Sequence, residues 1–215
     1  MEIKGVIFDM DGVLVDNSDI HIEAFVLFCK RHGISADLDY LRTLFGMGNE
    51  EIMPRVFGKE LTNDEISQYA EEKEEVYREI FAERIEPLKG LVDFLKEIKS
   101  KGIKIAVGSS GMAKNVNFVL EKCGIASYFD AIANGDMVER AKPDPAVFLI
   151  AADLLNLSPS QCVVFEDSFA GIQAARSAGA KVVAVATTYP RERHNDYDMI
   201  IDDFSQITYC DLEKL

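Results

Sequence analysis

The chain has 215 residues, of which 48% are apolar, which is enough to bury the interior of one large domain or of a core with an insert. Its 23 basic and 37 acidic residues give a formal net charge of -14, which repels phosphate backbones and anionic membranes. We therefore expect neither nucleic acid nor a membrane as a partner, and because no apolar run is long enough for a signal peptide or a spanning helix, we expect a cytoplasmic chain.

The first predicted strand is the apolar run 6–8, which leads directly into Asp9 and Asp11. The stretch that follows carries helical patterns but no convincing strand, and we interpret residues 17–85 as an all-helical insert with hinges near 16–17 and 86–87. The acidic run 71–75 is interpreted as a solvated helix face. The four predicted helices of the insert cover residues 20–28, 38–45, 49–57 and 62–80, the last with a capping box from Thr62 to Glu65.

Apolar runs of strand length return after the insert and alternate with helical patterns. The predicted strands cover residues 103–107, 131–133, 162–165 and 182–186, and the predicted helices cover 91–98, 116–123, a segment opening at Pro145, and 170–178. This alternation predicts an α/β fold with a Rossmann-like, doubly wound parallel sheet covered by helices on both faces. The sheet would be built from residues 1–16 and 86–215.

Three of the predicted strands lead into residues that carry chemistry. One precedes Asp9 and Asp11, another the Gly-Ser-Ser-Gly segment 108–111, and a third Glu166 and Asp167. The carboxyl ends of parallel strands share one edge of the sheet, where ligands bind in such folds. Four carboxylates there would repel one another and raise their own pKa values unless a cation lies between them. All-oxygen ligands favour Mg²⁺, with a substrate phosphate as a further ligand.

Each of these segments alone also fits a plain structural role. An Asp-Gly pair after a strand is often just a turn, and Gly-Ser-Ser-Gly is often an ordinary loop. The segment 141–145 could simply start a helix, with Asp144 as its cap and Pro145 at its first position. Yet Pro143 holds Lys142 extended, where its ammonium group could neutralise a phosphoryl group. The conjunction of the segments in this order favours a metal and phosphate site.

Together these segments resemble the motifs of the haloacid dehalogenase superfamily over almost the whole chain. Residues 8–16 (FDMDGVLVD) are similar to its first motif and residues 107–110 (VGSS) to its second. Residues 141–145 (AKPDP) resemble its lysine motif, and residues 165–180 (FEDSFAGIQAARSAGA) its acidic fourth motif. The insert resembles the helical cap of that superfamily, and the closest resemblance is to its branch of beta-phosphoglucomutases and sugar-phosphate phosphatases.

The resemblance implies a catalytic pair of carboxylates. Asp9 would be the nucleophile that forms an aspartyl-phosphate, and Asp11 would protonate the leaving oxygen and then take a proton from the hydrolytic water. An acidic residue at position 11 points to a phosphatase or a mutase, because the superfamily's dehalogenases lack an acid there and its transport ATPases carry threonine.

The resemblance also implies the residues that bind the phosphate and the metal. Ser109 and nearby backbone N–H groups would hold the phosphoryl oxygens, with Lys142 balancing charge, and Gly12 and Ser110 would belong to the same phosphate site. The expected ligands of the Mg²⁺ cofactor are Asp9, the backbone carbonyl of Asp11 and Asp167, with Glu166 as a direct or water-mediated ligand.

The insert is where the chain departs from the mutases that it resembles. His21 matches a mutase histidine near the hinge and Lys73 falls near a lysine of the cap, so both are expected to contact substrate, although His21 could be a plain surface or core-edge residue. The mutases carry a lysine and an arginine for a distal phosphate in the stretch matching residues 45–52. This chain has Phe45 and Asn49 there, and Asn49 is the expected substrate contact.

The leading hypothesis is a monomeric, Mg²⁺-dependent phosphatase that hydrolyses a small phosphorylated metabolite, a sugar phosphate, through an aspartyl-phosphate. The first alternative is a beta-phosphoglucomutase, supported by His21 and Lys73 and opposed by the missing basic pair. The second is a non-catalytic module that binds phosphorylated metabolites, which the intact set of chemical positions disfavours.

Overall fold

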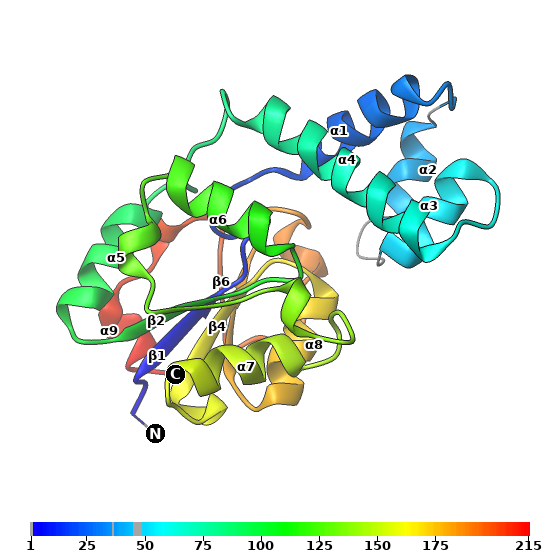
Figure 1. Cartoon of the computed structure of the whole chain (residues 1–215). Coiled ribbons are helices and arrows are strands. Elements are labelled where there is room, and N and C mark those ends of the chain that lie inside the picture. The colour runs from blue at the N-terminus through cyan, green and yellow to red at the C-terminus, as the bar shows by residue number, and fades with distance from the viewer. Residues whose placement is uncertain (1, 36, 45–48) are drawn as a thin grey trace. The chain divides into compact units, whose positions relative to one another are not determined.

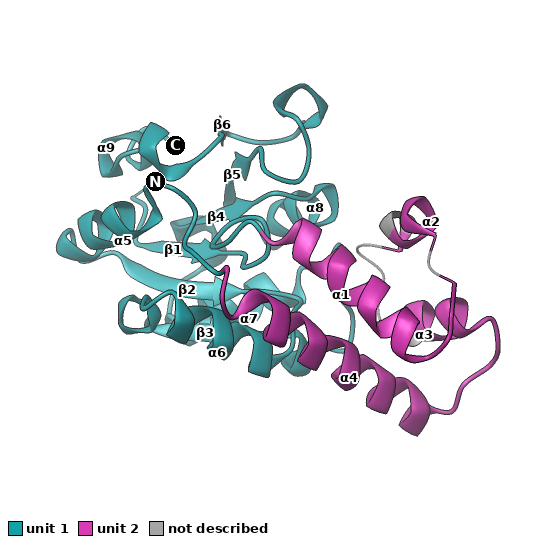
Figure 2. Ribbon diagram, turned by 90° about the horizontal axis from the view of Figure 1, so that it is seen from above, with its two compact units in different colours: residues 1–16, 85–215 teal, residues 17–84 magenta. Residues whose placement is uncertain are grey.

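The computed structural model describes residues 2–35, 37–44 and 49–215. The chain forms two compact units, shown in different colours in Figure 2. Met1–Asp16 and Ile85–Leu215 form the first, which we call the sheet unit, and Asn17–Arg84 form the second, the helical unit. Among the described helices, none combines the length and the apolar character needed to cross a bilayer.

The sheet unit contains six parallel strands in the order β3-β2-β1-β4-β5-β6. This order is that of a doubly wound sheet, so the predicted fold class is confirmed. The last strand was not predicted from the sequence. The strands are β1 (Gly5–Phe8), β2 (Lys104–Gly108), β3 (Ala131–Ala133), β4 (Cys162–Glu166), β5 (Lys181–Val185) and β6 (Met199–Ile201).

Helices cover both faces of the sheet (Figure 1). Successive residues of a strand point to opposite faces, so Ile7 packs into an apolar cluster with Phe148 and Ile172. The next residue, Phe8, stacks on Phe165 with ring centroids 5.0 Å apart on the other face, which α5 covers through Phe94. The helices of this unit are α5 (Leu91–Ser100), α6 (Ala113–Lys122), α7 (Ala146–Leu154), α8 (Phe169–Ala178) and α9 (Tyr209–Leu212).

The helical unit has its own apolar core, formed by buried residues that include Phe28, Leu41 and Met53. The predicted capping box is present: the Thr62 hydroxyl accepts from the Glu65 N–H, and the Glu65 carboxylate accepts from the Thr62 N–H at 2.8 Å. Two of the donors left unpaired at that helix start are thereby satisfied. The helices are α1 (Ser18–Arg31), α2 (Leu38–Thr43), α3 (Asn49–Phe57) and α4 (Asn63–Phe81).

The interpretation of residues 71–75 as a solvated face is wrong for part of that run. Glu74 is 7% exposed and Lys73 is 4% exposed, and their side chains form an ion pair. Glu71 pairs with Arg78, and Glu72 lies 3.0 Å from His32 Nε2. Because burial of a charge is costly without a partner, these pairs, two within α4 and one to His32 just after α1, explain how the acidic run is partly buried.

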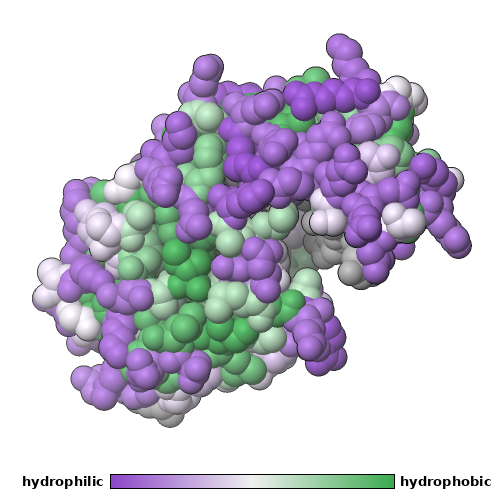
Figure 3. Space-filling model, in the orientation of Figure 1, coloured by the Kyte–Doolittle hydropathy of each residue, from purple (hydrophilic) through white to green (hydrophobic). Residues whose placement is uncertain are grey.

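The hydropathy of the surface differs between the two units in the view of Figure 3. The visible side of the helical unit is largely hydrophilic along α4. On the sheet unit, apolar side chains gather around α7, where Leu149 and Leu154 are exposed.

Candidate active site

The chemistry-bearing side chains lie at the carboxyl edge of the sheet, where β1 and β4 run side by side. Asp9 directly follows β1, Glu166 is the last residue of β4, and Asp167 comes next. The strand order reverses direction between β1 and β4, and ligands of doubly wound sheets bind in the crevice outside such a point. The topology therefore places the three carboxylates where a ligand can enter.

The three carboxylates form one buried cluster. One oxygen from each of Asp9, Glu166 and Asp167 lies within 4.8 Å of the others, and the residues are 6%, 1% and 6% exposed. Burial raises the pKa of Asp9 to about 7, against the opposing charge of Lys142 and with a further rise from Glu166. Burial, together with the charges of Glu166 and Asp9, also raises the pKa of Asp167 well above its usual range. The cluster is short of positive charge.

Lys142 contacts two members of this cluster. Its Nζ donates to Asp9 Oδ1 at 2.6 Å and to Glu166 Oε1 at 2.7 Å, and it lies 4.5 Å from the centroid of the Phe148 ring. Burial by itself lowers the pKa of a lysine, but the charges of Asp9 and Glu166 raise the pKa of Lys142 above its ordinary value. Lys142 is therefore a fixed cation beside Asp9.

Glu166 is held by hydrogen bonds on both of its carboxylate oxygens. Lys142 donates to Oε1, while the N–H and the hydroxyl of Ser168 donate to Oε2 at 2.7 and 3.0 Å. Gly171 lies so close that a Cβ there would overlap the Glu166 carboxylate. Ser168 also caps α8 by accepting from the Gly171 N–H, so the start of this helix and the Glu166 side chain are fixed together.

The turn after Asp9 brings the second aspartate back to the same edge. The N–H of Leu14 donates to the Met10 carbonyl at 2.8 Å, and the N–H of Gly12 donates to the Val15 carbonyl at 2.8 Å. Gly12 has φ +76, in the left-handed region that glycine adopts at least cost. Asp11 lies in this turn and its charge contributes to the raised pKa of Asp9.

Ser109 and Ser110 follow β2, the neighbour of β1 on its other side. Ser109 is 1% exposed, and its hydroxyl accepts from the Gly111 N–H at 2.9 Å, while Ser110 is exposed. The side chain of Ser109 thus faces inward and that of Ser110 outward, which distinguishes two residues that look alike in the sequence.

The predicted substrate contacts of the insert lie in the helical unit. The His21 ring stacks on Tyr77 with centroids 4.1 Å apart, and Asn17 Nδ2 donates to the Tyr77 hydroxyl at 2.7 Å. Lys73 pairs with Glu74 and lies 4.7 Å from the Phe25 ring centroid. The predictions that His21 and Lys73 bind substrate stay predictions. Phe45 and the side chain of Asn49 lie outside the described residues.

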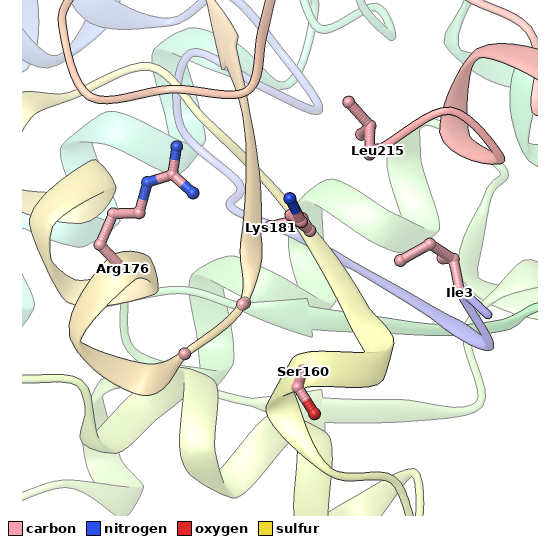
Figure 4. Close-up of a pocket in the computed structure, with 7 residues that line it drawn as sticks. Ile3, Ser160, Arg176, Lys181 and Leu215 are labelled. Carbon is pink, nitrogen blue, oxygen red and sulfur yellow. The ribbon is translucent and has the colours of Figure 1, made fainter. Parts of the chain in front are cut away.

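A separate pocket of about 320 Å³ opens at the amino ends of the strands, the opposite edge of the sheet (Figure 4). Arg176 and Lys181 line it, but both pair with Asp198, at 2.6 and 3.1 Å. Arg176 also pairs with Asp196 at 3.4 Å, so two carboxylates offset the two positive charges and the pocket lacks the features expected of an anion site.

Sequence reasoning missed two residues that contact the site. The Thr187 hydroxyl donates to the Gly12 carbonyl at 2.6 Å, and the Thr188 hydroxyl donates to Asp167 Oδ2. Both follow β5, a predicted strand, so their place at the carboxyl edge is the signal that could have found them.

A family model described as haloacid dehalogenase-like hydrolase matches residues 6–185 of the chain. The chain belongs to this family. The match begins within β1, ends with β5, and so contains the carboxylate cluster, Ser109 and Lys142. The resemblance drawn from the four motifs is confirmed.

Relatives of this haloacid dehalogenase-like hydrolase include both phosphatases and a mutase. The "Phosphorylated carbohydrates phosphatase" of Thermotoga maritima is 33% identical over 177 residues, 82% of each chain. The "Beta-phosphoglucomutase" of Bacillus subtilis is 33% identical over 196 residues, 87% of this chain and 85% of that protein. A crystal structure of a family IA, variant 3 hydrolase from Entamoeba histolytica has a TM-score of 0.90 at 29% identity over 100% of both chains. Equal identities to a phosphatase and a mutase do not separate the two reactions.

The donor set of this hydrolase fits a hard divalent cation. Its carboxylates supply oxygen ligands, the type that Mg²⁺ prefers, and the raised pKa values of Asp9 and Asp167 show that positive charge beyond Lys142 would stabilise their ionised forms. The buried Ser109 hydroxyl and the Lys142 ammonium group are hydrogen-bond donors that can contact an anionic phosphate.

Proposed function

We propose that this chain is a Mg²⁺-dependent phosphatase that hydrolyses phosphate esters of small carbohydrates through an aspartyl-phosphate. The observation that carries this proposal is the buried cluster of Asp9, Glu166 and Asp167, with the Lys142 ammonium group 2.6 Å from Asp9. A carboxylate beside a fixed cation at a sheet edge suits nucleophilic attack on an anionic phosphate.

In the proposed reaction, an oxygen of Asp9 attacks the phosphorus atom and the bond from phosphorus to the sugar oxygen breaks. Asp11 gives its proton to the departing sugar oxygen. A water molecule then attacks the phosphorus of the aspartyl-phosphate, Asp11 takes a proton from that water, and inorganic phosphate leaves with Asp9 restored. Ser109 and Lys142 hold the phosphoryl oxygens during both steps, since a hydroxyl and an ammonium group both donate hydrogen bonds.

Asp9, Asp167 and the carbonyl of Asp11 would hold Mg²⁺. The bound ion would supply positive charge that offsets repulsion between the Asp9 carboxylate and the phosphate. Both oxygens of Glu166 already accept hydrogen bonds from Lys142 and Ser168, which favours a contact with the ion through water.

The name of the Thermotoga maritima relative supports a carbohydrate phosphate as the substrate class. The name of the Bacillus subtilis relative supports the alternative, a beta-phosphoglucomutase. We favour hydrolysis because a mutase must grip a second phosphate, and Lys73, a candidate for that grip, is buried and paired with Glu74. In addition, residues 50 and 51 are both glutamates, whose charge opposes that of a phosphate.

Two assays test the proposal. Release of phosphate from an aryl phosphate and from a panel of sugar phosphates, with Mg²⁺ present, should show turnover, whereas a module that only binds phosphorylated metabolites would release none. Phosphorus NMR of beta-glucose 1-phosphate with a trace of the bisphosphate separates the two enzymes. We expect free phosphate as the product if this sugar reacts, and glucose 6-phosphate forming faster than free phosphate would instead establish the mutase.

A further inference from the structure

Two consecutive threonines reach from the end of β5 into the active-site edge. The Thr187 hydroxyl donates to the Gly12 carbonyl at 2.6 Å, and the Thr188 hydroxyl donates to Asp167 Oδ2. Strand β5 pairs directly with β4, so residues that follow β5 lie beside residues that follow β4. The two threonines that follow β5 therefore connect the segment after β1 with the segment after β4 through hydrogen bonds.

The fit around these hydroxyls is tight. A Cβ added to Gly12 would overlap the carboxylate of Asp167 and would lie 3.1 Å from the Thr188 hydroxyl oxygen. The turn that carries Asp11, the Asp167 side chain and the Thr188 hydroxyl thus occupy adjoining positions with no room for one more carbon atom.

The loop that carries the threonines is anchored next to them. Tyr189 stacks on Phe169, the first residue of α8, with ring centroids 4.4 Å apart, and Arg193 lies 5.2 Å from the Tyr189 ring. His194, 7% exposed, has Nε2 at 3.1 Å from the Tyr189 carbonyl oxygen. Because Phe169 is two residues after Asp167 and Tyr189 is one residue after Thr188, this stack holds the two partners of the hydrogen bond at a fixed separation.

We propose that Thr187 and Thr188 are positioning residues for the reaction: Thr187 fixes the turn that carries Asp11, and Thr188 fixes the orientation of the Asp167 carboxylate and thereby the affinity of the site for Mg²⁺. This inference rests on the proposed function. A hydrogen bond to one carboxylate oxygen sets the plane of the group, and partners of this kind change metal affinity or activity by about 10- to 100-fold when removed.

The test compares Thr188→Val, which removes the hydroxyl and keeps the shape, with Thr188→Ser, which keeps the hydroxyl. Calorimetric titration of Mg²⁺ into each protein without substrate should show a dissociation constant about tenfold higher for Thr188→Val. Thr188→Ser should stay within about threefold of the wild type. Turnover of an aryl phosphate should fall more in Thr188→Val than in Thr188→Ser, with a smaller change in KM than in kcat.

Thr208→Val is the matched control, because the Thr208 hydroxyl donates to a carboxylate oxygen of Asp211 at 2.8 Å in the capping box of α9. It should lower the melting temperature and leave Mg²⁺ affinity unchanged. Equal Mg²⁺ affinity in Thr188→Val and the wild type would overturn the proposal for Thr188. A Thr208→Val variant that loses as much Mg²⁺ affinity as Thr188→Val would overturn it too. Neither result touches the proposed function, because that function is tested by phosphate release from the wild type, which neither threonine variant decides.

Thr187→Val tests the other half of the proposal. Loss of the bond to the Gly12 carbonyl should lower kcat about tenfold through the Asp11 turn while KM for the aryl phosphate changes little. The melting temperature of the same preparation shows whether the fold is retained. An unchanged kcat would remove Thr187 from the positioning role.

Discussion

Gly12 illustrates at the residue scale how close packing and backbone conformation can demand the same residue. Its φ of +76 is costly for any residue with a Cβ, and its neighbours leave no space for that atom. The backbone of the turn that carries Asp11 can therefore approach the Asp167 carboxylate only because residue 12 is glycine.

We expect Gly12→Ala to lose nearly all phosphatase activity, because the added methyl group must displace the Asp167 carboxylate or the turn. Gly124→Ala is the control: its φ is +65, but no atom lies within 4 Å of the added Cβ. Both variants should lose about 1–2 kcal/mol of stability from the left-handed conformation. Activity should separate them, and an active Gly12→Ala enzyme would show that this turn is not held as tightly as described.

At the scale of elements, Asp198 connects α8 with β5. Its carboxylate accepts from the Val182 N–H of β5 at 2.8 Å and from Arg176 of α8 at 2.6 Å, and it pairs with Lys181. Burial raises the pKa of this carboxyl, but these hydrogen bonds and charges outweigh burial and hold the pKa below 3.8. Its contribution to stability is therefore present above pH 3.8 and is lost as pH falls through the lower pKa of the folded state.

Asp198→Asn should accordingly lower the free energy of unfolding at neutral pH by about 1 kcal/mol, the scale of a partly exposed charge-assisted bond. The difference between variant and wild type should shrink as the pH is taken below 3.8. Urea denaturation of both proteins at a series of pH values measures this difference. A difference in unfolding free energy that stays constant at acidic pH would mean that ionisation of Asp198 does not stabilise the contact between α8 and β5.

The elements that the sequence predicts best are those with long patterns or strong boundaries. Strands such as β1 and β4 are continuous apolar runs, and α4 opens with a capping box that is present in the structure. Strand β6 (Met199–Ile201) was missed although β3, of equal length, was predicted, and the pairing of β6 with β5 depends on long-range contacts. Thr187 and Thr188 were missed for a similar reason. Their hydrogen-bond partners, Gly12 and Asp167, lie far from them in sequence.

At the scale of the whole molecule, the strand order gathers residues from five parts of the chain. Asp9, Ser109, Lys142, Glu166 and Thr188 are far apart in sequence, and the parallel sheet places the ends of β1, β2, β4 and β5 at one edge. The motif order in the sequence could indicate such a site. It could not show that Lys73 is buried against Glu74, because that contact depends on how the helices of the second unit pack.

Chelation should stop turnover and Mg²⁺ should restore it, since the buried carboxylates at this edge need positive charge to stay ionised beside a phosphate. Mg²⁺ that binds the folded chain should also raise its melting temperature by linkage. Thermal unfolding with and without the ion, alongside phosphate release, checks both effects. Full activity after rigorous chelation would exclude the metal from the mechanism.

The most direct test of the account is turnover of an aryl phosphate by Asp9→Asn, with the wild type assayed in parallel and the melting temperature of both proteins recorded. An amide has nearly the same shape as a carboxylate but cannot act as the nucleophile, so we predict a folded protein whose turnover falls by a factor of about 1,000 or more, equivalent to about 4 kcal/mol of activation free energy. A folded Asp9→Asn variant that retains more than about a tenth of wild-type turnover, a loss of under about 1.4 kcal/mol, would contradict the aspartyl-phosphate mechanism.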